Sequence, residues 1–258
     1  MSAQIIAFAG QKGGVGKTTS ALNLGAAFQR RGERVLLVDM DPQADLTAGA
    51  GVELTEESPT VYQVLKGEIT PEAAIVEGHA FDLLPATDAL AMAEIELGSL
   101  PGRELLLRRV LRPVLDDYDW ILVDCPRGFG MLALNGLAIA TAYVVVVQTQ
   151  HFAVRHVDSL FEIAGQVAEI VNPGLVFAGY LPTMYNASKR QHTERLAEIK
   201  QRAAEEGSPL LPTVRENVAL ADAQSAGQSI FLFRPQSHGA EDYQAVAEAL
   251  AEQVMSRG

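Results

Sequence analysis

The stretch Ile5-Ile-Ala-Phe-Ala9 runs directly into Gly10-Gln-Lys-Gly-Gly-Val-Gly-Lys-Thr-Thr19, and this stretch decides the fold. Apolar residues then recur with helical spacing, at Ala21, Leu22, Leu24 and Phe28. Glycines let successive backbone N–H groups converge on phosphate oxygens without obstruction by a Cβ atom, and a helix N-terminus adds the positive end of its dipole. A strand, a glycine-rich loop and a helix in this order predict a phosphate-binding loop.

Individual residues of this loop have predicted roles. We expect Lys17 to reach the β- and γ-phosphates of a nucleotide, and the Thr18 hydroxyl to bind magnesium. The common pattern G-x-x-x-x-G-K-[ST] is matched imperfectly, because Gln11 occupies the position of its first glycine. The predicted nucleotide-binding residues of the loop are Gln11, Lys12, Gly13, Gly14, Val15, Gly16, Lys17, Thr18 and Thr19.

Carboxylates follow two further strand-like runs. Val35-Leu-Leu-Val38 precedes Asp39 and Asp41, and Trp120-Ile-Leu-Val123 precedes Asp124. A lone aspartate after a strand is usually a turn former or a helix cap. Ligands of doubly wound sheets, however, bind beyond the carboxyl ends of the strands. Two such strands after a phosphate-binding loop therefore favour a catalytic site, because they would place Asp39, Asp41 and Asp124 beside that loop.

Short runs of β-branched and aliphatic residues alternate with helical segments along the whole chain. Near-continuous apolar strands of this kind are typical of a parallel sheet that is covered on both faces. We therefore predict an α/β fold with a doubly wound, mostly parallel sheet and helices on both faces, in a single domain of residues 1–258. The segment 55–77 and the segment 98–102 are expected to be surface connections. The predicted strands are 5–9, 35–38, 81–84, 120–123, 143–147 and 175–181.

Composition limits the possible functions. The formal net charge is −12, so binding to DNA or to anionic membranes would require a local basic patch. Cys125 is the only cysteine, which excludes an intramolecular disulfide and a cysteine cluster for zinc or iron–sulfur, and fits a reducing cytoplasm. The N-terminus lacks the features of a signal peptide. The uncharged stretch 128–154 is interrupted by polar residues, and we interpret it as a buried helix and strand rather than a membrane span.

The loop resembles that of the ParA/MinD family of deviant Walker A ATPases, which reads Lys-Gly-Gly-x-Gly-Lys-Thr. The resemblance implies MgATP as the cofactor, slow ATP hydrolysis and an ATP-dependent homodimer. It makes Lys12 the signature lysine, which crosses the dimer interface to the partner's nucleotide, much as an arginine finger does. It also implies that Asp41 orients the attacking water, and that Met184 and Asn217 contact the nucleotide. Asp124 becomes the Walker B residue that acts on the magnesium shell, and Asp39 supports the magnesium and phosphate network, so the implied metal residues are Thr18, Asp39 and Asp124. The implied catalytic residues are Lys12, Lys17 and Asp41.

Within this family the chain is most similar to the ParA (Soj-like) partition branch, through segments 172–186 and 234–243. MinD-type members end in a basic amphipathic membrane helix, whereas the tail 241–258 carries four acidic residues and Arg257, so no membrane contact is expected. The resemblance implies a switch for chromosome or plasmid partition, whose hydrolysis a ParB-like or other partner protein stimulates. Such a protein would be cytoplasmic, and nucleoid-associated when ATP-bound.

The chain departs from the partition pattern in two places. Arg127 stands in a region that usually reads Asp-x-Pro-Pro-Ser, and Arg215-Glu-Asn-Val-Ala219 replaces a basic stretch associated with DNA binding. Five basic residues between 189 and 202 could compensate, although a charge run on a helix is usually a solvated face; a second basic cluster lies between 103 and 112. We expect weak, nonspecific DNA binding, chiefly through Lys189, Arg190, Arg195, Lys200 and Arg202.

Two alternatives remain open. The chain could be a ParA-like ATPase that positions a protein cargo or an organelle, which the lost positive charge favours. It could also be a P-loop small-molecule ligase, since that fold hosts several chemistries. A ligase would not need Lys12, so the dependence of dimerisation on Lys12 discriminates between these functions.

Overall fold

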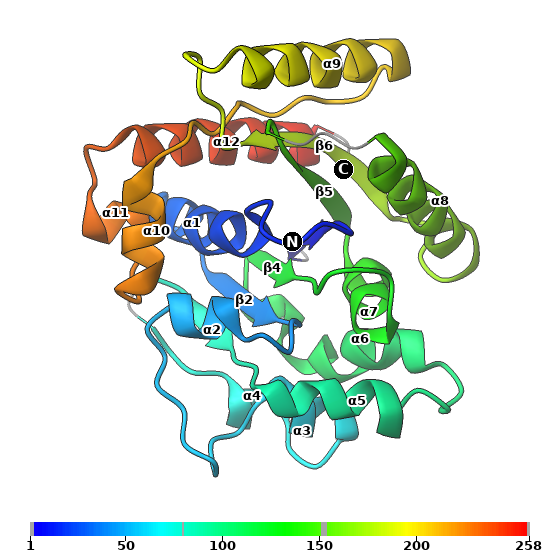
Figure 1. Cartoon of the computed structure of the whole chain (residues 1–258). Helices are drawn as coiled ribbons and strands as arrows, with labels where there is room; N and C mark the ends of the chain where they lie inside the picture. The colour runs from blue at the N-terminus through cyan, green and yellow to red at the C-terminus, as the bar shows by residue number, and fades with distance from the viewer. Residues whose placement is uncertain (1–2, 79, 151–153, 257–258) are drawn as a thin grey trace.

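The computed structural model describes residues 3–78, 80–150 and 154–256. Six parallel strands form one sheet in the order β3-β2-β4-β1-β5-β6, with the phosphate-loop strand near its middle (Figure 1). All six predicted strands are confirmed. Their bounds are β1 Gln4–Ala9, β2 Val35–Asp39, β3 Asp82–Leu84, β4 Trp120–Asp124, β5 Ala142–Gln148 and β6 Val176–Thr183.

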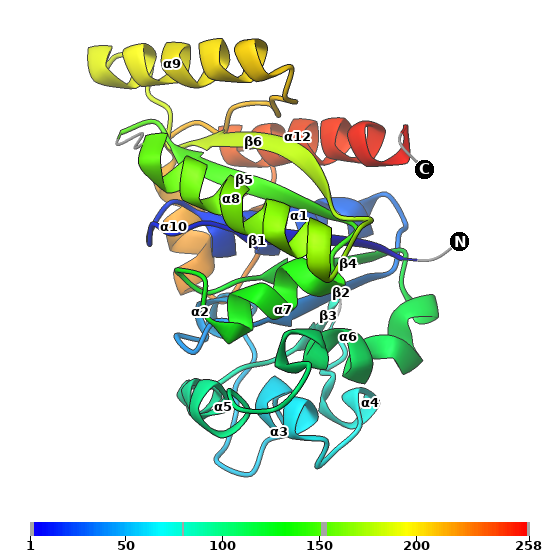
Figure 2. The same ribbon diagram turned by 90° about the vertical axis from the view of Figure 1, so that its right-hand side faces the viewer.

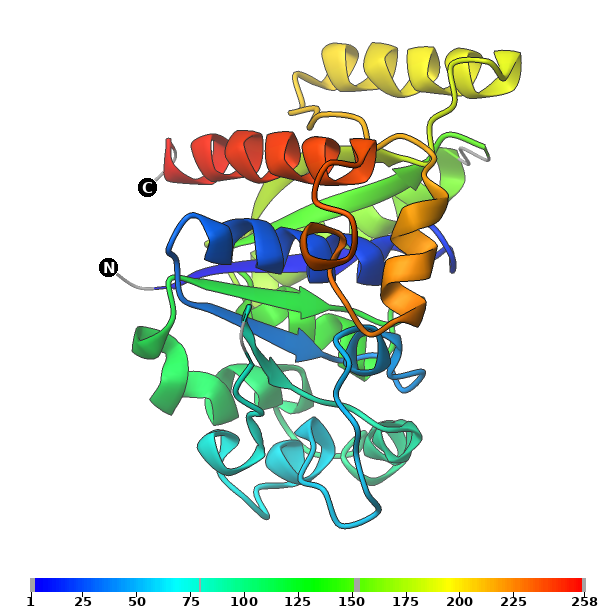
Figure 3. The same cartoon turned by 90° about the vertical axis from the view of Figure 1, so that its left-hand side faces the viewer.

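Helices cover both faces of the sheet, as the alternating pattern predicts. On one face lie α1 (Lys17–Arg30), α10 (Val218–Ser225), α11 (Ile230–Phe233) and α12 (His238–Met255), as Figure 3 shows. The opposite face carries α3 (Val61–Lys66), α6 (Leu106–Leu111), α7 (Met131–Ile139) and α8 (Val154–Ile170), of which Figure 2 shows α7 and α8 in front of the strands. The remaining elements are the helices α2 (Asp45–Gly49), α4 (Pro71–Ala74), α5 (Ala91–Glu96) and α9 (Arg190–Glu206), and the 3-10 helices η1 (Asp88–Leu90), η2 (Arg103–Leu105) and η3 (Arg112–Asp117).

The strands are buried on both faces because almost every side chain in them is apolar. In β1, Ile6 and Phe8 pack with α1 and α12, whereas Ile5 and Ala7 belong to the core on the other face. This alternation follows from the two-residue period of a strand. At the edge of the α1 face, the rings of Phe28 and Trp120 stack at 4.0 Å. The central strands are therefore held between two apolar layers, and their carboxyl ends have a fixed position.

The expectation that segment 55–77 is only a surface connection is wrong in part. Its helix α3 buries Val61, Val64 and Leu65 in the core beside β3. These residues are spaced as one face of a helix, so burial follows from the same periodicity that places the longer helices. Gly98 and Gly102 do lie in turns, as expected.

In the described part of the chain no helix combines the length and apolar character that crossing a membrane requires. The uncharged stretch instead forms α7 and β5, as predicted, and residues 151–153 of it lie outside the described part. In the last helix, α12, the side chains of Tyr243, Val246, Ala247 and Leu250 recur with helical spacing and are buried. Arg257 of the tail also lies outside the described residues.

Candidate functional site

The phosphate loop connects β1 to α1 in a conformation that requires glycine at two positions. Gly14 has φ of 71° and Gly16 has φ of 97°, values that side chains other than glycine rarely adopt. The Thr183 hydroxyl, at the end of β6, donates a hydrogen bond of 2.7 Å to the Val15 carbonyl and ties the loop to the sheet. The backbone N–H groups at the start of α1 consequently face a fixed space beyond the strand ends.

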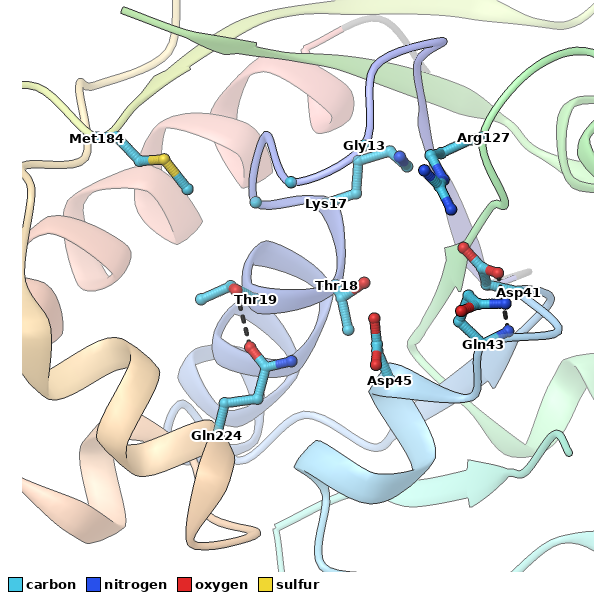
Figure 4. Close-up of a pocket in the computed structure, with 12 residues that line it drawn as sticks. Gly13, Lys17, Thr18, Thr19, Asp41, Gln43, Asp45, Arg127, Met184 and Gln224 are labelled. Atoms are coloured by element: carbon cyan, nitrogen blue, oxygen red, sulfur yellow. Dashed lines mark hydrogen bonds between the residues drawn. The ribbon is translucent and has the colours of Figure 1, made fainter. Parts of the chain in front are cut away.

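That space is a cavity of about 460 Å³. Figure 4 shows that its lining comes from segments far apart in the sequence, with the loop and α1 in the middle. Lys17, the predicted phosphate-binding lysine, lines it and is otherwise largely buried, at 7% exposure. The lining residues are Gly13, Gly14, Gly16, Lys17, Thr18, Thr19, Asp41, Gln43, Asp45, Arg127, Met184 and Gln224.

Thr18 and Asp124 meet behind the loop. The Thr18 hydroxyl donates a hydrogen bond of 2.6 Å to Oδ2 of Asp124, while Oδ1 of Asp124 is buried and has no hydrogen-bond partner among the described residues. Burial, and next the negative charge of Asp39, raise the pKa of Asp124 to about 8. A buried carboxylate oxygen without a partner beside a hydroxyl is an arrangement that a cation would satisfy.

These residues fit magnesium. The described side chains include no group of three His, Cys, Asp or Glu arranged to hold a metal ion without further ligands. Magnesium in nucleotide sites usually takes only one or two protein ligands, together with phosphate oxygens and water. Thr18 and Asp124 would supply the protein's share, and the nucleotide would supply the rest.

Asp39, a predicted metal-site residue, has both carboxylate oxygens hydrogen-bonded within the protein. It pairs in register with Asp124 on the neighbouring strand and is fully buried. Its Oδ2 accepts hydrogen bonds from the Thr47 backbone (2.9 Å) and hydroxyl (2.7 Å), and its Oδ1 accepts one from the Asp41 backbone (3.1 Å). Burial raises the pKa of Asp39 to about 6, against the lowering effect of these bonds. Asp39 thus fixes the turn that carries Asp41, and its contact with magnesium stays a prediction.

Asp41 lines the cavity, as a residue that orients water must. Its Oδ1 accepts a hydrogen bond of 3.0 Å from the backbone N–H of Gln43, which sets the direction of the carboxylate. In Figure 4 the carboxylates of Asp41 and Asp45 lie on the side of the cavity that faces Thr18 and Lys17. The position therefore fits the predicted role.

Lys12 is held by the end of β5. Its ammonium donates a hydrogen bond of 3.1 Å to Oε1 of Gln148, and Nε2 of Gln148 contacts the Met184 sulfur at 3.0 Å. Met184 has a positive φ of 55°, uncommon for a residue with a side chain, and it lines the cavity. The predicted signature lysine and the predicted nucleotide-contacting methionine are thereby linked through one glutamine that the sequence did not indicate.

Asn217 does not line the cavity. Its side-chain oxygen accepts a hydrogen bond of 2.9 Å from the Ala219 backbone and caps the N-terminus of α10. The cavity instead receives Gln224 from the other end of that helix, and Thr19 donates a hydrogen bond of 2.9 Å to it. Sequence reasoning missed Gln224 because a glutamine inside a helix has no recognisable motif. The nucleotide contact of Asn217 remains a prediction.

The basic cluster on α9 is largely paired with carboxylates. Lys189 contacts Glu216 (2.7 Å), Arg190 contacts Glu194 (2.7 Å), and Arg202 contacts Glu206 (2.7 Å) and also Asp158. Arg195 pairs with Glu198 in the same way, and Lys200 is exposed. Glu216, which stands in the segment 215–219 that replaces a basic stretch of partition ATPases, thus neutralises part of the predicted DNA-binding patch. The positive charge available to a phosphate backbone is smaller than the sequence suggests.

Comparison with known proteins agrees with this architecture. A family described as an AAA domain matches residues 3–177. The chain is 37% identical over 252 residues to the sporulation initiation inhibitor protein Soj of Bacillus subtilis, covering 96% of this chain and 98% of that one. It is 40% identical to the chromosome-partitioning ATPase Soj of Thermus thermophilus, covering 98% and 95%. A crystal structure of cobyrinic acid a,c-diamide synthase from Mycobacterium smegmatis, with bound ADP and magnesium, superposes with a TM-score of 0.86 at 34% identity, covering 99% and 97%.

Proposed function

The chain belongs to the ParA/MinD family of deviant Walker A ATPases, and on this premise we propose that it is an ATP-dependent dimerising switch for DNA segregation. The observation that carries the proposal is the meeting of Lys17, Thr18 and Asp41 at one cavity beyond the strand ends, with the buried Asp124 hydrogen-bonded to Thr18. We further propose that residues 1–258 act as one ATPase domain in the cytoplasm.

Each residue has a part in ATP hydrolysis. Lys17 and the loop amides bind the phosphates, and Thr18 and Asp124 hold magnesium, which neutralises charge on the phosphate oxygens. Asp41 orients the water that attacks the γ-phosphate. Phosphoryl transfer requires positioning and charge stabilisation more than covalent catalysis, so these few side chains suffice. Met184 contacts the nucleotide away from the reacting phosphate.

Dimerisation depends on Lys12 in this proposal. In the isolated chain the Lys12 ammonium is held by Gln148, so it must leave that glutamine before it can reach a partner's nucleotide. Because Gln148 also contacts Met184 in the cavity wall, nucleotide binding and the release of Lys12 can be coupled through one side chain. ATP would then favour the dimer, which is how a nucleotide-dependent two-state switch operates.

The relatives named for chromosome partitioning support DNA as the scaffold. The family resemblance implies a ParB-like or other protein as the activator. The ion pairs on α9 support only weak DNA binding, with nucleoid association limited to the ATP-bound dimer. They also keep open the second candidate, in which the switch positions a protein cargo. Both candidates share the same ATPase cycle.

The similarity to a cobyrinic acid a,c-diamide synthase motivates the third candidate, a small-molecule ligase. Light scattering during gel filtration, with ADP and with ATP, tests the switch directly. We expect a dimer only with ATP, no dimer for Lys12→Ala, and a persistent dimer for Asp41→Ala, which binds ATP but does not cleave it. A wild-type chain that stays monomeric with ATP would refute the switch, and an ATPase independent of Lys12 would favour the ligase.

A further inference from the structure

We propose that Arg127 is a catalytic residue that binds the γ-phosphate of the ATP held by its own subunit; this inference rests on the proposed function. Arg127 follows the Walker B strand β4 by three residues and lines the nucleotide cavity. It is one of the points at which the chain departs from the partition pattern, which has no charged side chain there. The structure therefore adds a cation to the site that the family resemblance does not supply.

Arg127 lies directly against the phosphate loop. A Cβ atom built on Gly13 would stand 2.6 Å from Cδ of Arg127 and 3.1 Å from its Nη1. The side chain thus occupies the space beside Gly13 that a bare glycine leaves open. A guanidinium at this point is adjacent to the loop amides that bind phosphate oxygens.

The position along the cavity identifies which phosphate Arg127 meets. In Figure 4 the Arg127 side chain points toward Asp41, whereas Met184 and Gln224 lie on the other side of Lys17. Asp41 marks the end where water attacks, and Met184 marks the direction of the remainder of the nucleotide. Arg127 therefore faces the terminal phosphate.

The guanidinium of Arg127 is available for an incoming anion. Within residues 3–78, 80–150 and 154–256, Arg127 forms no hydrogen bond or ion pair with another side chain, and the residue is exposed. The arginines of α9, in contrast, are paired with carboxylates. A planar guanidinium with five N–H donors matches two oxygens of one phosphate group, and contact with phosphate would not first require an ion pair to break.

The chemical step uses this charge without moving a proton from it. The water oxygen forms a bond to the γ-phosphorus, the bond from that phosphorus to the bridging oxygen breaks, and its electron pair leaves on ADP. The proton of the water passes through the phosphate product to solvent. Arg127 stays protonated and stabilises the negative charge on the γ-phosphate oxygens as it redistributes in the transition state. Lys12 would provide a second cation from the partner subunit.

Steady-state kinetics give the first test, in the absence of DNA and activator. For Arg127→Ala we expect kcat to fall about 10- to 100-fold while ADP affinity changes less than about threefold, because the contact is made to the γ-phosphate in the transition state. Arg127→Lys should recover part of kcat. Arg109→Ala, an exposed arginine of α6 outside the cavity, is the matched control and should match wild type.

A mixing experiment then tests whether Arg127 acts within its own subunit. If Arg127 acts in cis and Lys12 in trans, a heterodimer of Arg127→Ala and Lys12→Ala subunits contains one complete site. Because Lys12→Ala subunits are not expected to pair with one another, the two variants carry different tags and the heterodimer, which retains one Lys12, is isolated with ATP through both tags. It should hydrolyse ATP at about half the wild-type rate per dimer. If Arg127 acted in trans, both sites of the heterodimer would be defective and no activity would return.

The possible outcomes distinguish a failure of the role of Arg127 from a failure of the proposed ATPase switch. Unchanged kcat for Arg127→Ala, or an isolated heterodimer without ATPase activity when wild type dimerises and hydrolyses ATP, would overturn the role of Arg127 and leave the proposed function intact. A wild-type chain that neither dimerises nor hydrolyses ATP would overturn both. ATPase activity of the isolated heterodimer, together with a loss confined to kcat, supports the assignment.

Discussion

Binding of MgATP should release a proton from Asp124. In the nucleotide-free chain this buried carboxyl has a pKa of about 8, raised from 3.8 mainly by burial and next by the charge of Asp39. At pH 7 it is ionised in only about one molecule in ten. A carboxylate must be ionised to act on magnesium, so binding should release roughly 0.9 proton per site at pH 7 and roughly 0.1 at pH 9.

Calorimetry with preformed MgATP measures this release. The observed enthalpy should differ between two buffers of different ionisation enthalpy at pH 7 and become nearly equal at pH 9. Affinity should rise about tenfold per pH unit up to about pH 8 and then level. Asp39, with a pKa of about 6, is already mostly ionised at pH 7 and adds little.

Two controls make the assignment specific. Asp124→Asn should remove the buffer dependence of the binding enthalpy, and ATP with a chelator in place of magnesium should show almost none. Equal enthalpies in both buffers at pH 7 for the wild-type chain would refute the reasoning.

The pH dependence of folding stability has the opposite sign to that of binding. Because the pKa of Asp124 is raised in the folded chain, the stability that this group contributes is present below about pH 4 and is lost as the pH rises toward about 8.

Three further variants test the site and the surface. Lys17→Ala should abolish MgATP binding in calorimetry, because its ammonium offsets phosphate charge in a largely buried position; unchanged affinity would contradict the assignment of the loop. Thr183→Val should lower stability by about 1 kcal/mol through loss of the bond that ties the loop to β6, measured by urea denaturation, and an unaltered midpoint would argue against that tie. In mobility-shift titrations at low salt with ATP, Lys189→Gln/Glu216→Gln should weaken DNA binding less than twofold, because it removes an ion pair and leaves the local net charge unchanged; complete loss would restore Lys189 as a main DNA contact.

The sequence alone was sufficient to predict the parts of the site that are formed by residues close together in the chain. The phosphate loop is contiguous, so its glycines, Lys17 and Thr18 could be assigned from their spacing between a strand and a helix. Asp39 and Asp124 could be brought together because both end parallel strands, and the structure pairs them in register. The resemblance added the family, which the comparisons confirm, and the roles of Lys12 and Asp41, which remain predictions.

Only the tertiary structure decided what each side chain contacts across long sequence distances. It linked Lys12 to Gln148, placed Gln224 and Arg127 in the cavity wall, and assigned Asn217 to a helix cap. It also paired Lys189 with Glu216, which is 27 residues away, so a charge count along one helix overestimated the free positive charge. The physical reason is that glycine conformation, strand ends and helix starts are properties of neighbouring residues, whereas the partner of a charge or an amide depends on which elements pack together.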